Sequence, residues 1–201
     1  MGEVWRFGPF AVTDPYRTVV DIARTSAFRY ALGYVDGLAR EYDVEREELR
    51  AYAQANCRGL HGIARAFDVF EYMDGRSDNG GESEARAAMI LAGVAAPELQ
   101  VEIFRPGNAG YYLADYGWQM PDGSWMLAEL HGLGKFEDDT QNDLEHAAAK
   151  TYRAALLRDA NLRAMGHNVI HFKLSDTYDV DAFGAMMRGY GIPTTKPFAD
   201  S

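Results

Sequence analysis

Thiols are scarce in this chain, which has one cysteine, Cys57, among its 201 residues. An intramolecular disulfide is therefore impossible, and a zinc site of four thiolates is excluded. There is also no run of about 18 apolar residues that would predict a membrane-spanning helix. No positively charged leader followed by an apolar run opens the sequence. These absences predict a soluble, cytoplasmic protein that does not contact membranes.

Basic residues are outnumbered, since 20 Lys and Arg stand against 30 Asp and Glu, for a formal net charge of -10 at pH 7. A surface that binds nucleic acid by neutralising phosphates is usually basic on at least one face. The charge balance therefore counts against a function in nucleic-acid binding. With 47% hydrophobic and 12% aromatic residues, the chain can bury a core and form one domain, or one domain with an appendage.

The first third of the chain has helical periodicity. A short strand and a turn at Asp14-Pro15 are predicted first, from "VWRFGPFAVTDPYR". Apolar residues then recur at helical spacing, which predicts three consecutive helices within residues 18–73, the first of them over residues 18–42. Asp43 is a plausible N-cap for the second of them, because an acidic first turn follows it.

A polar, glycine-rich break at residues 74–81, "DGRSDNGG", separates this region from one of different character. From residue 81 onward the patterns predict a helix, three strands, a helix, a strand and a helix. A meander of three strands with a helical crossover to a fourth gives a mixed sheet with helices on its faces. We therefore predict an α/β protein with a helical N-terminal region at residues 1–75 and an αβββαβα core at residues 76–201.

Two carboxylates fall on neighbouring strands of the predicted sheet. Asp115 lies seven positions before Asp122 in the turn "PDG", and Glu129 lies seven positions after it. If the two strands form an antiparallel hairpin, Asp115 and Glu129 are cross-strand neighbours on one face. Their mutual repulsion would be relieved by a hard divalent cation such as Mg2+ or Mn2+. The alternative is a pair of rim residues that face solvent or basic neighbours.

These patterns together resemble the PD-(D/E)XK nuclease superfamily, and in particular actinobacterial proteins related to the very short patch repair endonuclease. The similarity rests on four segments in the same order as in that family. They are "GESEARAAMILAGVAAPELQVEI", "LADYGW", "AELHGLGKF" and "LLRDANLRAMGHNVIHFKLSDTYD". The resemblance implies a restriction-endonuclease-like core and metal-dependent hydrolysis of DNA phosphodiesters, in repair or defence.

Within that resemblance, Asp115 and Glu129 would be the metal ligands and Glu82 the acidic residue of the first core helix. Acids at a helix start also interact favourably with the helix dipole, which is an alternative role for Glu82. The family often carries lysine or aspartate two positions after the glutamate, and this chain has His131. An imidazole at that position can act as a base or a ligand, or can be a hydrogen-bonded structural residue. Lys135 matches a lysine of the relatives, and a solvated loop lysine is the alternative.

The long helix after the sheet supplies cations for substrate binding. Arg158 matches an Arg-Asp pair of the relatives and would bind a phosphate oxygen, with Lys150 as a second contact. Surface charges that balance one another at i,i+4 spacing are the alternative. The predicted cofactor is Mg2+ or Mn2+ and the predicted partner is DNA, with a homodimer or a partner protein also open. A catalytically degenerate binding or scaffold domain of a defence or toxin-antitoxin system is the second hypothesis for the whole chain.

Overall fold

The computed structural model describes residues 4–108, 110–131 and 141–199, with residues 141–152 described by their backbone. It is a mixed α/β structure with one two-stranded and one four-stranded sheet in this part of the chain. The chain forms two compact units, Met1–Leu91 with Pro197–Ser201, and Ala92–Lys196. In the described residues, no helix is both long enough and apolar enough to cross a membrane.

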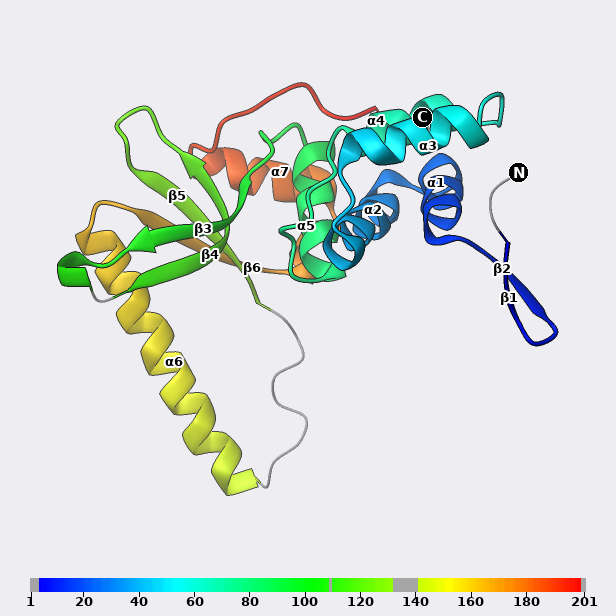
Figure 1. Cartoon of the computed structure of the whole chain (residues 1–201). Helices are drawn as coiled ribbons and strands as arrows, with labels where there is room; N and C mark the ends of the chain where they lie inside the picture. Colours follow the sequence, from blue (N-terminus) through cyan, green and yellow to red (C-terminus); the bar gives the residue numbers. More distant parts are fainter. Residues whose placement is uncertain (1–3, 109, 132–140, 200–201) are drawn as a thin grey trace. The chain divides into compact units, whose positions relative to one another are not determined.

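The first unit is a short hairpin followed by five helices (Figure 1). The hairpin pairs β1 with β2 antiparallel, where the sequence predicted a single strand. The difference arises at Gly8, whose φ of 60° permits the tight reversal. In chain order the elements are β1 (Val4–Phe7), β2 (Phe10–Thr13), α1 (Pro15–Thr25), α2 (Phe28–Tyr42), α3 (Arg46–Asn56), α4 (Ile63–Phe70) and α5 (Gly80–Leu91).

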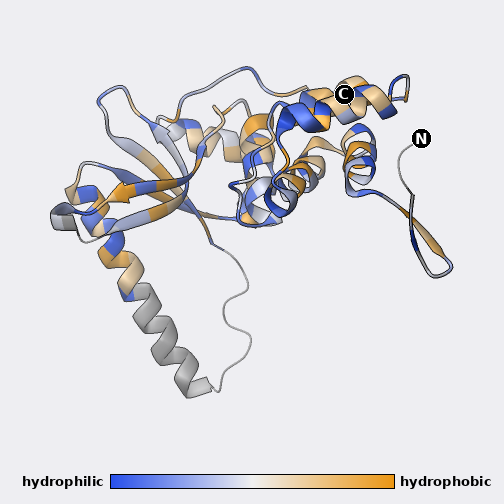
Figure 2. Ribbon diagram, in the orientation of Figure 1, coloured by the Kyte–Doolittle hydropathy of each residue, from blue (hydrophilic) through white to orange (hydrophobic). Residues whose placement is uncertain are grey.

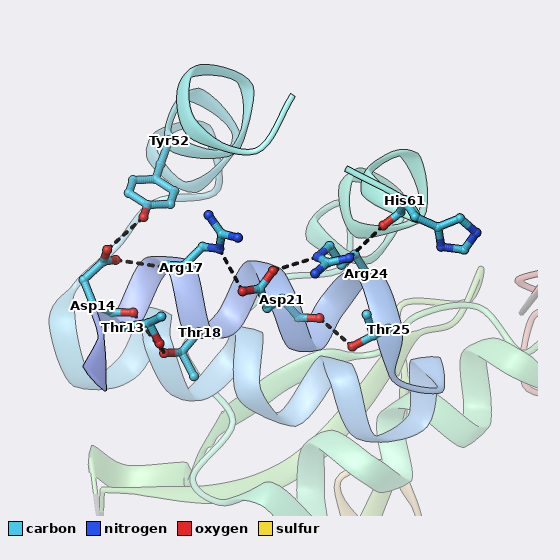
Figure 3. Close-up of polar contacts among 9 residues, drawn as sticks. All are labelled: Thr13, Asp14, Arg17, Thr18, Asp21, Arg24, Thr25, Tyr52 and His61. Carbon is cyan, nitrogen blue, oxygen red and sulfur yellow. Dashed lines mark hydrogen bonds and ion pairs between the residues drawn. The ribbon is translucent and has the colours of Figure 1, made fainter. Parts of the chain in front are cut away.

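The start of α1 is fixed by side-chain contacts that also join it to α3 (Figure 3). The carboxylate of Asp14 caps the helix by accepting from the backbone N–H of Arg17 at 2.8 Å. The hydroxyl of Tyr52 in α3 donates to the other oxygen of Asp14 at 2.9 Å. One carboxylate therefore closes the end of one helix and holds a second helix beside it.

Two predictions about these helices are wrong in detail. Residues 18–42 were expected to form one helix, but α1 ends at Thr25 because Ser26 adopts an extended conformation, with ψ 158°. Asp43 is not the N-cap of the next helix, since it ends α2 in the left-handed region with φ 52°. Asp tolerates that region better than most residues, and Glu45 takes the N-cap position of α3 instead.

A buried ion pair joins α2 to α5 inside the first unit. The guanidinium of Arg86 donates to both carboxylate oxygens of Asp36 at 2.8 Å, and the two side chains are 4% and 0% exposed. Asp36 also accepts from the backbone N–H of Asp74 at 2.9 Å. Because α5 is tied to α2 in this way, the boundary between the units lies after Leu91 rather than at the predicted position between residues 75 and 76.

The second unit contains a mixed sheet in the order β3-β4-β5-β6, with β5 and β6 parallel and the other neighbours antiparallel. From residue 81 onward, the predicted order of helices and strands is the observed order. In Figure 2, hydrophilic and hydrophobic residues follow one another along β3. The elements are β3 (Glu98–Phe104), a 3-10 turn (Pro106–Asn108), β4 (Tyr111–Gln119), β5 (Trp125–His131), α6 (Gln141–Ala164), β6 (Asn168–Lys173), a second 3-10 turn (Leu174–Thr177) and α7 (Val180–Gly189).

Different helices pack on the two faces of this sheet. Under α6 lies an apolar cluster in which Leu162 of the helix packs with Leu127 and Val169 of the strands. On the other face, the ring of Phe172 contacts Phe183 of α7, with ring centroids 5.2 Å apart. The face under α6 also carries the candidate site, because Glu129 follows Leu127 at the two-residue repeat of a strand.

Candidate functional site

The strands β3 and β4 share an interruption that sets the position of Asp115. Their pairing includes Leu99 with Tyr116 and Val101 with Ala114, and Gln100 between them has φ 52°. A positive φ is uncommon for a residue other than glycine. Asp115 is therefore placed at a local distortion of the sheet, and such irregularities are over-represented next to active sites.

The distortion changes which face the side chains occupy. Ala114 and Val101 pack in the cluster with Leu162 of α6. Tyr116, only two residues after Ala114, instead contacts Phe172 on the opposite face. The usual alternation therefore breaks at Asp115.

The carboxylate of Asp115 reaches sideways to the neighbouring strand. Its Oδ2 accepts a hydrogen bond from the backbone N–H of Leu130 at 2.8 Å. The pairs of Gly117 with Leu127 and Tyr116 with Ala128 have the register expected for a hairpin centred on Asp122. Continued by one residue, this register brings Asp115 beside Glu129, so the predicted pairing of the two strands is confirmed.

Glu129 is held in a desolvated and negatively charged environment. The pKa of its carboxyl is raised to about 7, mainly by burial and next by the nearby charge of Asp115, against an opposing effect of Arg158. Its side chain is 13% exposed. The two predicted metal ligands therefore lie close enough to repel each other.

Consecutive residues of α6 bind different strands of the sheet. Arg158 forms an ion pair with Oε1 of Glu129 in β5 and donates to the backbone carbonyl of Leu113 in β4. The next residue, Asp159, contacts Nε2 of His171 in β6 at 2.7 Å. Side chains at adjacent helix positions diverge by about 100°, so one turn of α6 engages three strands. Arg158, which the sequence predicts as a substrate-binding residue, therefore lies beside Glu129.

Two histidines complete the described side chains around Glu129. His171 is the partner of Glu129 in the parallel pairing of β5 and β6. The ring of His131, two residues after Glu129, stacks on the ring of His171 with centroids 4.8 Å apart. His131 therefore lies at the site, in a pair of imidazoles one of which is oriented by Asp159.

The other predicted site residues are placed differently. Glu82 belongs to the first unit, where its carboxylate accepts from the backbone N–H of Asp78 at 2.8 Å and from the side-chain amide of Asn79 at 2.7 Å. These contacts cap the start of α5, the structural role weighed from the sequence. Lys135 lies outside the described residues, and so does the side chain of Lys150 in α6.

His171 and Asp159 were not among the predicted site residues. The sequence does hold a signal for His171, because it is a polar residue between the buried Ile170 and Phe172. This alternation places His171 on the face of the strand opposite to those two residues. Its proximity to Glu129 depends on the parallel pairing of β5 with β6, which are joined through α6. The alternation within one strand cannot give that pairing.

The donor set suits a hard cation. Magnesium in proteins is typically bound by one or two carboxylates together with water and substrate phosphate oxygens. Asp115 and Glu129 supply such a pair, and their repulsion is of the kind that a cation relieves. Among the side chains that the structure describes, no three His, Cys, Asp or Glu residues form a group that could hold a metal ion.

Comparison with known proteins identified two uncharacterised proteins of Mycobacterium tuberculosis, MT2308 of strain CDC 1551 and Rv2248 of strain ATCC 25618. Each is 36% identical over 106 residues, which is 53% of this chain and 38% of the relative. The chain therefore spans less than half the length of the curated relatives that it matches. No protein-family model matches, and no solved structure matches.

Proposed function

We propose that this protein is a metal-dependent phosphodiesterase that hydrolyses DNA, with Asp115 and Glu129 as the metal ligands. The observation that carries the proposal is the juxtaposition of these two carboxylates at the distortion in β4, where burial and then the charge of Asp115 raise the pKa of Glu129 to about 7. A sheet that brings two repelling carboxylates together loses stability unless a cation joins them.

The residues around the carboxylates suit phosphoryl chemistry. Bound at Asp115 and Glu129, Mg2+ or Mn2+ would lower the pKa of a water molecule and neutralise charge on the phosphate. The guanidinium of Arg158 has the fork geometry that binds phosphate oxygens. The imidazole of His171, oriented by Asp159, can accept a proton at its other nitrogen, Nδ1, and His131 stacks beside it.

The proposed fold assignment is that of a PD-(D/E)XK nuclease core. The observed order of α5, β3, β4, β5, α6, β6 and α7 supports it, together with the mixed sheet. Glu82 has no part in the proposed chemistry, since its described contacts belong to the start of α5. The acidic composition suggests that DNA contact is confined to the neighbourhood of Arg158.

Cleavage assays test the proposal directly. Supercoiled and single-stranded DNA are incubated with the native protein in Mg2+ or Mn2+, beside Asp115→Asn, Glu129→Gln and the matched control Glu98→Gln. Glu98 is an exposed carboxylate of the same sheet. We expect metal-dependent cleavage by the native protein and the control, and a loss of roughly 100-fold or more in each site variant. Equal cleavage by all four proteins, or none by any, would contradict the proposal.

A second candidate is a binding or scaffold domain of a defence or toxin-antitoxin system that has lost catalysis. The ion pair between Arg158 and Glu129 favours it, because an internal cation already neutralises one of the two carboxylates. In that case the native protein binds DNA or a partner protein, and neither Mg2+ nor Mn2+ produces cleavage.

A further inference from the structure

We propose that Arg158 is an internal competitor of the divalent metal, which holds Glu129 while the metal is absent and is released to the substrate phosphate when the metal binds. This inference rests on the proposed function of the Asp115 and Glu129 pair. The added step is regulatory: Arg158 binds Glu129 first and the substrate phosphate second.

The guanidinium of Arg158 occupies a position that a bound metal would need. Arg158 contacts Oε1 of Glu129, one of the carboxylate oxygens that a metal shared with Asp115 would need. Both side chains of this ion pair are largely shielded, at 26% and 13% exposed. In such surroundings a guanidinium and a divalent cation repel each other more strongly than in water, so simultaneous binding to the same carboxylate is disfavoured.

Arg158 has a second hydrogen-bond acceptor besides Glu129. The same Nη2 donates to the backbone carbonyl of Leu113, a neutral acceptor in β4. Loss of the carboxylate contact therefore leaves the guanidinium with an acceptor on the protein, close to the site. The guanidinium then stays close enough to the site to meet a phosphate oxygen brought by the substrate.

The backbone of α6 does not have to move when Arg158 changes its partner. Asp159 ties α6 to His171 at 2.7 Å, and Leu162 of α6 packs in the apolar cluster with residues of the strands. These contacts hold the backbone of α6 against the sheet whichever partner Arg158 has. Replacement of the arginine by the metal at Glu129 then requires only a rotation of the Arg158 side chain.

The test compares Mn2+ binding by calorimetric titration in the native protein, Arg158→Met and Arg158→Lys. Removal of the competing guanidinium is expected to tighten Mn2+ binding by roughly tenfold, since hydrogen bonds to charged groups change equilibria by about that factor. Arg158→Lys keeps the charge and should bind Mn2+ with an affinity between those of the native protein and Arg158→Met. Cleavage of DNA by Arg158→Met is expected to fall although its metal binding is tighter, a combination that simple loss of packing would not produce.

Arg163→Met is the matched control, because Arg163 lies on the same helix, is 60% exposed and approaches Asp159 only at 4.0 Å. Its Mn2+ affinity should equal that of the native protein. Equal or weaker Mn2+ binding by Arg158→Met, with metal-dependent cleavage by the native protein intact, would overturn this inference alone. Absence of Mn2+ binding in every variant would overturn both this inference and the proposed function.

Discussion

Replacement of Glu129 by Gln should stabilise the second unit at alkaline pH and leave its stability unchanged at acid pH. In the folded protein the pKa of Glu129 is about 7, against an ordinary value of 4.5. Below pH 4.5 the carboxyl is protonated in both the folded and the unfolded chain, so its ionisation has no effect. Between pH 4.5 and 7 the unfolded chain loses this proton first, and the free energy of unfolding falls as the pH rises.

The size of the effect follows from that difference. At about 1.4 kcal/mol for each pH step, the interval from 4.5 to about 7 corresponds to roughly 3 kcal/mol of lost stability above pH 7. The side chain is 13% exposed, so solvent screening reduces this value little. We expect Arg158 to keep its hydrogen bond to the carbonyl of Leu113 in the variant, because that acceptor is unchanged. The expected gain for Glu129→Gln at pH 8 is therefore about 2 to 3 kcal/mol.

Urea unfolding followed by tryptophan fluorescence measures this gain. Of the three tryptophans, Trp118 and Trp125 lie in the second unit and Trp5 in the first. A Trp5→Phe background therefore restricts the signal to the sheet that carries Glu129. EDTA is present throughout. If the free energy of unfolding differs between Glu129→Gln and its background by the same amount at pH 4.5 and at pH 8, the assignment of a raised pKa to Glu129 is refuted.

The remaining predictions concern the first unit and the packing of the sheet. Asp36→Ala should lower the free energy of unfolding by about 3 to 5 kcal/mol, because it leaves the buried Arg86 without its carboxylate. Addition of Arg86→Met to this variant should restore part of the lost stability. Urea unfolding followed by circular dichroism measures both changes. Gly62→Ala should lower the free energy of unfolding by about 3 kcal/mol, because its Cβ would lie 2.2 Å from the carbonyl oxygen of Arg24. Gly59 has a similar positive φ but open space around it, so Gly59→Ala should lower the free energy of unfolding by only about 1 kcal/mol. Gly117→Ala should lower the stability of the second unit by about 1 to 3 kcal/mol, because its Cβ would lie 2.9 Å from a methyl carbon of Val101, and the tryptophan signal reports this.

The sequence predicted those features of the site that depend on local spacing. A tight turn at Asp122 sets the register of its hairpin, so equal distances along the chain were enough to pair Asp115 with Glu129. The order of elements in the second unit followed from the change between helical and strand periodicity, with a glycine at the end of α6.

Features that depend on contacts between distant segments were missed. Nothing in the composition around Gln100 marks a left-handed residue, because glutamine has no special preference for that region. The position of His171 beside Glu129 requires the parallel pairing of β6, which is joined to β5 through α6. The break at Ser26 lacks the glycine or proline that usually marks a helix end, so periodicity alone carried the predicted helix across it.

Proton release on metal binding tests the central claim most directly. Mn2+ is titrated into the metal-free native protein at pH 7 in two buffers that differ in ionisation enthalpy. At this pH, close to the pKa of Glu129, the carboxyl is about half protonated, so each bound Mn2+ should release about half a proton. Glu129→Gln should release essentially none and should bind Mn2+ much more weakly. Absence of binding, or binding with the same proton release in Glu129→Gln as in the native protein, would contradict the claim that Asp115 and Glu129 form a metal site.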